Sequence, residues 1–243
     1  MSNPDSRIYL ASASPRRHDL LNQIGVRHDV LDVPSPPGED EPRHADEDAA
    51  SYVLRTACEK AHRAIVWITD QQLVAQPVLS ADTTVVLDGE ILGKPADAHD
   101  AARMLLKLSG RTHIVRTAVV LAQTKTVPGL ATTTNASTPV LKAPAAPSVP
   151  TLPTAPTTPT TPVPIADTHH LVSETLVTFR LLSDADIARY VATGEPFGKA
   201  GAYGIQGMAG AFVQTIQGSY TGVMGLPIYE TAALLSKLGI RIP

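Results

Sequence analysis

Four separated groups of polar residues in this chain are suited to chemistry on a phosphorylated substrate. They are residues 12–17, Glu41 with Lys60, Asp82 with Lys94, and a glycine-rich loop at residues 199–206. Arginine and lysine suit a polyphosphate, and carboxylates suit a hard cation such as Mg²⁺, which takes one or two protein carboxylates plus substrate phosphates. A carboxylate can also deprotonate an attacking water. These groups therefore predict metal-assisted hydrolysis of a nucleotide phosphoanhydride.

Arg16 and Arg17 stand at the start of an expected helix, directly after Ser14 and Pro15. Serine is a preferred helix N-cap, and proline is tolerated at the first helical position because its missing N–H would have no partner there. The helix dipole disfavours two cations at this end unless an anion lies between them. The motif predicts a phosphate site, with two exposed surface arginines as the alternative. A twin-arginine export signal is excluded because polar residues interrupt the apolar stretch it requires.

Asp82 lies inside the strongest strand signal of the chain, residues 78–87. A carboxylate within an apolar β run carries a desolvation cost unless a metal ion, a bound water or a lysine offsets it. Asp82 is therefore a candidate for metal binding or proton transfer. The alternative is that it ends the strand or accepts backbone hydrogen bonds.

The loop at residues 198–210 is dense in glycine and poor in hydrophobic bulk, which suits close approach of the backbone to a ligand. Residues 194–199, at the start of this region, are not a phosphate-binding P-loop. Ala200 stands where that motif requires serine or threonine, the glycines are too closely spaced, and no strand precedes them.

Alternating strands and helices must position these groups. Strands are expected at residues 8–11, 26–33, 78–87, 90–92, 111–121, 171–179 and 211–216. Helices are expected at 15–24, 49–68, 98–108, 184–192 and 228–238. Asp88-Gly89 predicts a two-residue hairpin turn, and residues 111–121 and 171–179 are expected to pair antiparallel.

Composition narrows the class of protein. With 243 residues, 43% of them hydrophobic, the chain can bury the core of one large domain or two lobes. A net charge of −3 argues against a nucleic-acid binder that relies on bulk positive charge. The single cysteine, Cys58, excludes an intrachain disulfide and fits a reducing, cytoplasmic compartment. No apolar run approaches the roughly 18–20 residues needed to span a bilayer, so no membrane association is expected.

Residues 126–164 form an unusual insert. They hold ten of the 21 prolines and a single charged residue, Lys142, so the segment lacks the periodicity and apolar bulk to pack. It is predicted to be a disordered, partly polyproline-II excursion from a hairpin. A docking or modification role is possible, but nothing in the segment is specific for one.

Several motifs, in order, resemble those of the Maf family of nucleoside triphosphate pyrophosphatases. The first is Leu10-Ala11-Ser12-Ala13-Ser14-Pro15-Arg16-Arg17, with Leu20-Leu21 and Gly25 after it. The others are Asp40-Glu41, Glu59-Lys60-Ala61, Ala81-Asp82-Thr83, Gly93-Lys94-Pro95, residues 199–207, Gly218-Ser219-Tyr220 and Gly225-Leu226-Pro227. The resemblance covers nearly the whole chain apart from the insert, which is the main departure from the family pattern.

The resemblance implies a two-lobed α/β fold with a long twisted mixed sheet and a central cleft, similar to inosine triphosphate pyrophosphatases. Residues 1–243 would form a single catalytic domain, interrupted by 126–164. It also implies cleavage between the α- and β-phosphates, which releases a nucleoside monophosphate and pyrophosphate.

The resemblance also implies roles for individual residues. Phosphates would be held by Ser12, Arg16, Arg17, Lys60 and Lys94, with Thr83, Lys199 and Gln206 as further substrate contacts. Glu41 and Asp82 would serve a divalent cation, Mg²⁺ with Mn²⁺ as the other possibility, and the attacking water. Asp82 would be the proton acceptor. A cytoplasmic homodimer is what the family suggests.

Two motifs resemble the branch of the family that acts on dTTP and UTP: Ala81-Asp82-Thr83, and residues 203–207, Tyr-Gly-Ile-Gln-Gly. Modified pyrimidine nucleotides are possible further substrates. The Gln206 amide offers a donor beside an acceptor, which complements the carbonyl and N–H of thymine and uracil but not of cytosine. The alternative is that Gln206 hydrogen-bonds only its own loop.

A second class of function is a regulatory protein that senses a nucleotide and acts through partners, for example on cell division. The set Glu41, Lys60, Asp82 and Lys94 favours the enzyme, because a sensor needs no carboxylate to activate water.

Overall fold

The computed structural model describes residues 7–34, 42–124 and 165–242. Its strands are β1 (Ile8–Leu10), β2 (His28–Val30), β3 (Val78–Leu87), β4 (Glu90–Leu92), β5 (Thr112–Thr124), β6 (Ile165–Phe179) and β7 (Val213–Gln217). Its helices are α1 (Pro15–Gln23), α2 (Ala49–Asp70), α3 (Ala98–Leu108), α4 (Asp184–Ala192), α5 (Tyr220–Met224) and α6 (Ile228–Ser236), with 3₁₀ turns η1 (Ala200–Ala202) and η2 (Met208–Phe212). Glu41 and the insert at 126–164 lie outside the described residues.

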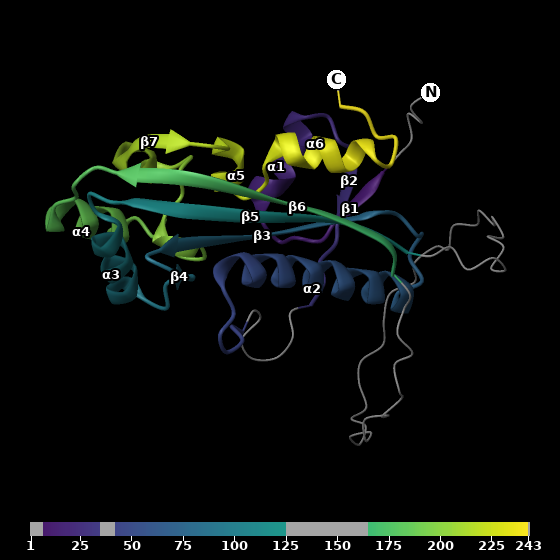
Figure 1. Cartoon of the computed structure of the whole chain (residues 1–243), viewed down its shortest axis with the longest axis horizontal. Coiled ribbons are helices and arrows are strands. Elements are labelled where there is room, and N and C mark those ends of the chain that lie inside the picture. The colour runs from purple at the N-terminus through teal and green to yellow at the C-terminus, as the bar shows by residue number, and fades with distance from the viewer. Residues whose placement is uncertain (1–6, 35–41, 125–164, 243) are drawn as a thin grey trace, which may run out of the picture.

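The strands form one seven-stranded mixed sheet in the order β2-β1-β3-β5-β6-β7, with β4 beside β3 (Figure 1). β1 is parallel to β2 and β3, whereas the β3–β5, β5–β6 and β6–β7 pairs are antiparallel. Helix α2 covers one face of the sheet, and α1 and α6 lie on the opposite face (Figure 1). The predicted α/β class with a long mixed sheet is confirmed.

The parallel part of the sheet is wound in two directions from β1. The first crossover, through α1, leads to β2 on one side, and the second, through α2, leads to β3 on the other. In open α/β sheets a ligand binds outside the carboxyl ends of the strands where the order reverses. The order reverses between β1 and β3, so this topology directs a binding site to the space beyond the carboxyl end of β1, where Ser12 follows β1 and Asp82 lies farther along β3.

The sheet forks along β3. Its first part pairs with β1 up to Leu10↔Leu79, and its last part pairs with β4 from Val85↔Leu92 onward. Residues 80–84 pair with β5 on one edge, and no strand of the described chain pairs with them on the other. The fork separates two lobes that share β3, β5 and β6, and Asp82 lies at its centre.

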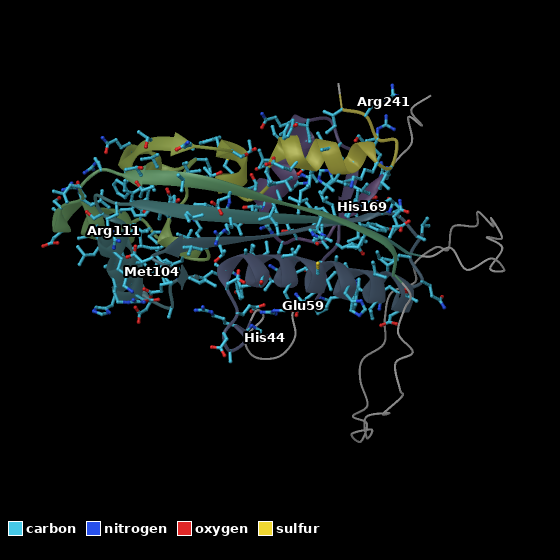
Figure 2. All side chains as sticks on the ribbon, viewed as in Figure 1. His44, Glu59, Met104, Arg111, His169 and Arg241 are labelled. Atoms are coloured by element: carbon cyan, nitrogen blue, oxygen red, sulfur yellow. The ribbon has the colours of Figure 1, made fainter. Side chains whose placement is uncertain are left out.

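Three hydrophobic clusters follow this division. One contains Leu105, Phe179 and Tyr190 and packs α3 and α4 against one end of the sheet. The other two lie on opposite faces at the other end, under α2 and under α1 and α6. Figure 2 labels Met104, a member of the first cluster, at the α3 end of the molecule, and His169 of β6 toward the other end.

Several predicted boundaries match the structure closely. Helix α4 spans the predicted residues 184–192 and begins with a capping box, in which the Ser183 hydroxyl and the Asp186 carboxylate each accept the other residue's N–H. Asp88 and Gly89 both have positive φ, as a type I′ hairpin turn requires, and they join β3 to β4. The predicted antiparallel pairing of residues 111–121 with 171–179 is also confirmed.

Other boundaries were wrong. The second strand spans 28–30 rather than 26–33, and the last strand begins at Val213 because residues 208–212 form η2. Helix α5 was not predicted. No helix in the described segments has the length and apolar character needed to cross a bilayer.

His113 of β5 is buried in the core between Phe179 and Tyr203. Its Nε2 lies 2.8 Å from the Tyr203 hydroxyl, and its Nδ1 has no hydrogen-bond partner in the described structure. Burial lowers the pKa of His113 from 6.5 to about 4, because the core disfavours the charged ring.

This burial predicts acid sensitivity. Between pH 6.5 and pH 4 the unfolded chain binds a proton that folded His113 does not, so the free energy of unfolding falls as the pH falls. The expected contribution is a loss of about 2 kcal/mol between pH 7 and pH 5. Urea unfolding at both pH values measures it. The His113→Gln variant should lose this part of the pH dependence. The control variant His62→Gln, at an exposed histidine, should keep it. Equal pH dependence in the two variants would show that His113 is not the source of the acid sensitivity.

Candidate active site

A cleft of about 710 Å³ opens where the sheet forks. Nine of the residues singled out from the sequence line it: Ser12, Arg16, Arg17, Lys60, Asp82, Thr83, Lys94, Lys199 and Gln206. They come from the β1–α1 turn, the first turn of α1, α2, β3, the segment after β4 and the loop after α4. The structure thus brings together every predicted site residue except Glu41, which lies outside the described residues.

The Asp82 carboxylate is only 4% exposed and lies in the middle of β3. Its Oδ1 lies 2.6 Å from Nζ of Lys60, and its Oδ2 accepts a 2.8 Å hydrogen bond from the Thr56 hydroxyl. Both partners come from α2. The alternative that Asp82 simply ends a strand is therefore wrong, and its desolvation is offset by a lysine and a hydroxyl.

Arg17 is 9% exposed and directs its guanidinium into the protein. Its Nε donates to the Gly225 carbonyl at 2.7 Å, its Nη1 to the Ser12 hydroxyl at 2.9 Å, and its Nη2 to the Thr83 hydroxyl at 3.3 Å. One side chain therefore ties together the β1–α1 turn, β3 and the end of α5.

The bond to Thr83 begins a directed chain of hydroxyl groups. Thr117 donates to the Gly222 carbonyl at 2.8 Å, so its own oxygen must accept from Thr83, 2.9 Å away. Thr83 then uses its lone pair to accept from Arg17. The Gly222 carbonyl can only accept a hydrogen bond, so it fixes the direction in which Thr117 and then Thr83 donate.

Arg16 and Lys199 bring positive charge to the cleft from opposite lobes. Arg16 donates to the Met224 carbonyl at 3.3 Å, and burial lowers its pKa. The pKa of Lys199 is also lowered, first by burial and then by the charge of Arg16, while the Glu195 carboxylate opposes that shift. Two cations that disfavour each other's charge are stabilised when an anion binds between them.

Ser14 occupies the N-cap of α1 as predicted, but its side chain makes no capping hydrogen bond. Its N–H instead donates to the Ser12 hydroxyl at 3.3 Å. This end of the helix lines the cleft beside Arg16 and Arg17, which is the arrangement expected for a phosphate site.

Gln206 also lines the cleft. Its side chain is exposed, and its amide makes no hydrogen bond with any residue that the structure describes. The alternative that it bonds only its own loop therefore has no support in this structure. Val85, Ile91 and Val115 line the cleft as well, and apolar walls of this kind suit a nucleobase.

Sequence reasoning gave no role to several residues that line the cleft, among them Asp32, Tyr52, Arg63 and Tyr203. Asp32 had a usable signal, because it follows a strand at the edge where parallel strands end. Tyr52 and Arg63 lie on α2, where the default interpretation is a surface residue. Tyr203 lay inside the glycine-rich loop but was not assigned a role.

The family model for Maf-like protein matches residues 7–144 and 158–238 of the chain. A dTTP/UTP pyrophosphatase of Bordetella pertussis is 51% identical over 237 residues, which cover 98% of this chain and 95% of that protein. The protein of the same name from Chromobacterium violaceum is 42% identical over 250 residues and matches both chains from end to end. That from Shigella dysenteriae is 44% identical over 233 residues, 95% of this chain and 92% of its own.

Proposed function

The chain belongs to the Maf-like family, and from that premise we propose that it hydrolyses dTTP and UTP to the nucleoside monophosphate and pyrophosphate. Relatives that align over nearly its whole length carry that activity in their names. The observation that carries the proposal is the cleft, which joins the Asp82–Lys60 pair to cations from both lobes and to Gln206. No observation favours a regulatory role.

Phosphate binding falls to the basic residues and the turn after β1. Arg16, Lys94 and Lys199 line the cleft from three separate segments, and Ser12 lies in the turn that Arg17 holds. Cations that converge on one anion stabilise the charge that builds up on the leaving pyrophosphate. Arg17 contributes mainly by holding that turn, because its guanidinium donates to oxygens of Ser12, Thr83 and Gly225.

We infer that Asp82 accepts the proton of the attacking water. Lys60 and Thr56 each bond one of its carboxylate oxygens, so the group is held in one orientation. The water oxygen bonds to the α-phosphorus, and the bond from that phosphorus to the bridging oxygen breaks. The bonding electrons leave with pyrophosphate, and the water proton passes to Asp82.

A divalent cation fits this donor set. The described residues contain no group of three or more histidine, cysteine or acidic side chains that would hold a metal by themselves. Mg²⁺ needs only one or two protein carboxylates when substrate phosphates complete its ligands, and Asp82 supplies one inside the cleft. We propose Asp82 and Glu41 as the protein ligands of Mg²⁺ or Mn²⁺. Bound there, the cation neutralises phosphate charge.

Gln206 is proposed to recognise the base. Its amide pairs a donor and an acceptor with the carbonyl and N–H of thymine or uracil, and cytosine would leave both unsatisfied. Modified pyrimidine triphosphates that keep this edge would also be accepted. We further propose that the protein works as a cytoplasmic homodimer without nucleic acid, in keeping with its single cysteine and net charge of −3.

The proposal predicts a defined product pattern. Purified protein with Mg²⁺ should release pyrophosphate and monophosphate from dTTP and UTP, with kcat/KM at least about tenfold above dCTP and purine triphosphates. EDTA should abolish turnover, and added Mg²⁺ should restore it. Anion-exchange chromatography of the products and a pyrophosphate assay measure both. Release of diphosphate and inorganic phosphate, or no turnover of any triphosphate, would contradict the proposal.

A further inference from the structure

The segment that carries Gln206 is held at both ends by two side chains outside the cleft lining. Before Gln206, the Gly204 N–H donates to the Tyr190 hydroxyl oxygen at 3.3 Å. After it, the Met208 N–H donates to Oε2 of Glu195 at 3.0 Å. Tyr190 is on the last part of α4, and Glu195 lies in the turn that follows.

Tyr190 and Glu195 are themselves joined. The Tyr190 hydroxyl donates to Oε1 of Glu195 at 2.9 Å, so it accepts from Gly204 with a lone pair. The same carboxylate oxygen also accepts the Ala209 N–H at 3.4 Å. The two side chains therefore form one clamp, with attachment points on either side of Gln206.

The clamp is anchored in the core. Tyr190 is 3% exposed and packs edge-on against Phe212, with ring centroids 5.1 Å apart. Burial raises the pKa of Tyr190, and its hydrogen bond to the Glu195 carboxylate raises it further, so the phenol keeps the proton that it donates. Its position is fixed by packing as well as by hydrogen bonds.

The loop packs closely against the clamp. A Cβ on Gly207 would lie 2.4 Å from Oε1 of Glu195, so a larger residue there would push the carboxylate away from its bonds to Met208 and Ala209. The Lys199 stem crosses Gly204, where a Cβ would lie 3.1 Å from its Cε, and Lys199 Nζ donates to the Glu195 carbonyl. Glu195 thus contacts the loop through its side chain and Lys199 through its main chain, so a side-chain substitution at Glu195 leaves the Lys199 contact in place.

The Gln206 amide depends on this support. Its Oε1 lies 3.7 Å from the point that a Cβ on Gly204 would occupy, so the amide lies close to the residue that Tyr190 holds. No described residue hydrogen-bonds the amide, so the clamp acts on it by fixing the backbone from which the Gln206 side chain starts. Two simultaneous hydrogen bonds to a base tolerate displacements of only about 0.5 Å.

We infer that Tyr190 and Glu195 are positioning residues that set the preference for thymine and uracil by holding Gln206 in place. The inference rests on the proposed function. A loop released from the clamp lets Gln206 adapt its amide to other bases, so discrimination is lost while phosphate binding and the Asp82 chemistry remain.

The experiment compares kcat/KM for dTTP with kcat/KM for dCTP. Tyr190→Phe removes one hydroxyl and keeps the ring, and it should lower the dTTP-to-dCTP ratio about tenfold while kcat for dTTP changes less than about threefold. Glu195→Gln, which turns an amide N–H toward a backbone N–H, should act in the same direction. Tyr229→Phe, at an 81% exposed tyrosine on α6, is the matched control and should leave the ratio unchanged.

A double-mutant cycle separates positioning from general destabilisation. If Tyr190 acts through Gln206, Tyr190→Phe should lower the ratio no further in the Gln206→Ala background. A ratio unchanged in Tyr190→Phe and Glu195→Gln, or equal losses on both nucleotides, would overturn the inference and leave the proposed function intact. A wild type that does not prefer dTTP to dCTP would overturn the proposed specificity first, and the inference with it.

Discussion

Asp82→Asn is expected to hydrolyse dTTP about 10³-fold more slowly than the wild type, because the amide cannot accept the water proton. Asparagine keeps the size of the side chain and an oxygen for Lys60, which lies 2.6 Å from the carboxylate. The measurement is kcat under saturating dTTP and Mg²⁺, with circular dichroism to verify the fold.

Two further variants define the effect at Asp82. Thr56→Val removes the hydrogen bond to the other carboxylate oxygen and should reduce kcat by a smaller factor, because it changes orientation rather than basicity. Asp88→Asn, at an exposed carboxylate paired with Arg111, should leave kcat unchanged. Full turnover by Asp82→Asn would refute the role of Asp82 as proton acceptor.

Arg17→Ala should reduce kcat/KM for every nucleotide by the same factor and also destabilise the protein. The substitution deletes hydrogen bonds to Gly225, Ser12 and Thr83, and it leaves acceptors in the interior without their donor. At about 1 kcal/mol for each bond, the free energy of unfolding should fall by about 3 kcal/mol. For a chain of this length that corresponds to a drop of roughly 10 °C in Tm.

The neighbouring residue supplies the matched comparison. Arg16 makes one long hydrogen bond, to the Met224 carbonyl at 3.3 Å, and lines the cleft. Arg16→Ala should therefore lose activity on all nucleotides with a change in Tm of only a few degrees. Thermal unfolding and kcat/KM for dTTP, UTP and dCTP test both variants. Equal stability of the two, or a loss confined to one nucleotide, would contradict the division of roles.

Local signals predicted most of the fold. The capping box at Ser183 and the turn at Asp88-Gly89 act over a few residues, so short-range chemistry alone identifies them. The start of β7 was misplaced because Ala211 and Phe212 have the composition of a strand. They form η2 instead, where the Glu195 carboxylate binds the N–H groups of Met208 and Ala209. A contact from a residue 13 positions earlier leaves no trace in local composition.

The sequence predicted which residues belong to the site better than it predicted how those residues are buried and bonded. Charge and motif spacing identified Arg16, Arg17 and Asp82, and the cleft unites them. Residue type does not reveal burial, however, so the sequence treats the two arginines alike although only Arg17 lies inside the protein. Glu195 carried no signal, because a single glutamate in a turn is by default a surface charge.

The fork at β3 bears on how substrate preference can change over evolutionary time. Between residues 80 and 84 one edge of the strand has no neighbouring strand in the described structure, and every second peptide of such an edge turns its polar groups outward. Contacts that a ligand makes to main-chain groups survive any substitution of the side chain. Substitutions on the surrounding loops can then change which substrate is preferred without removing the main-chain groups of residues 80–84 that contact the ligand.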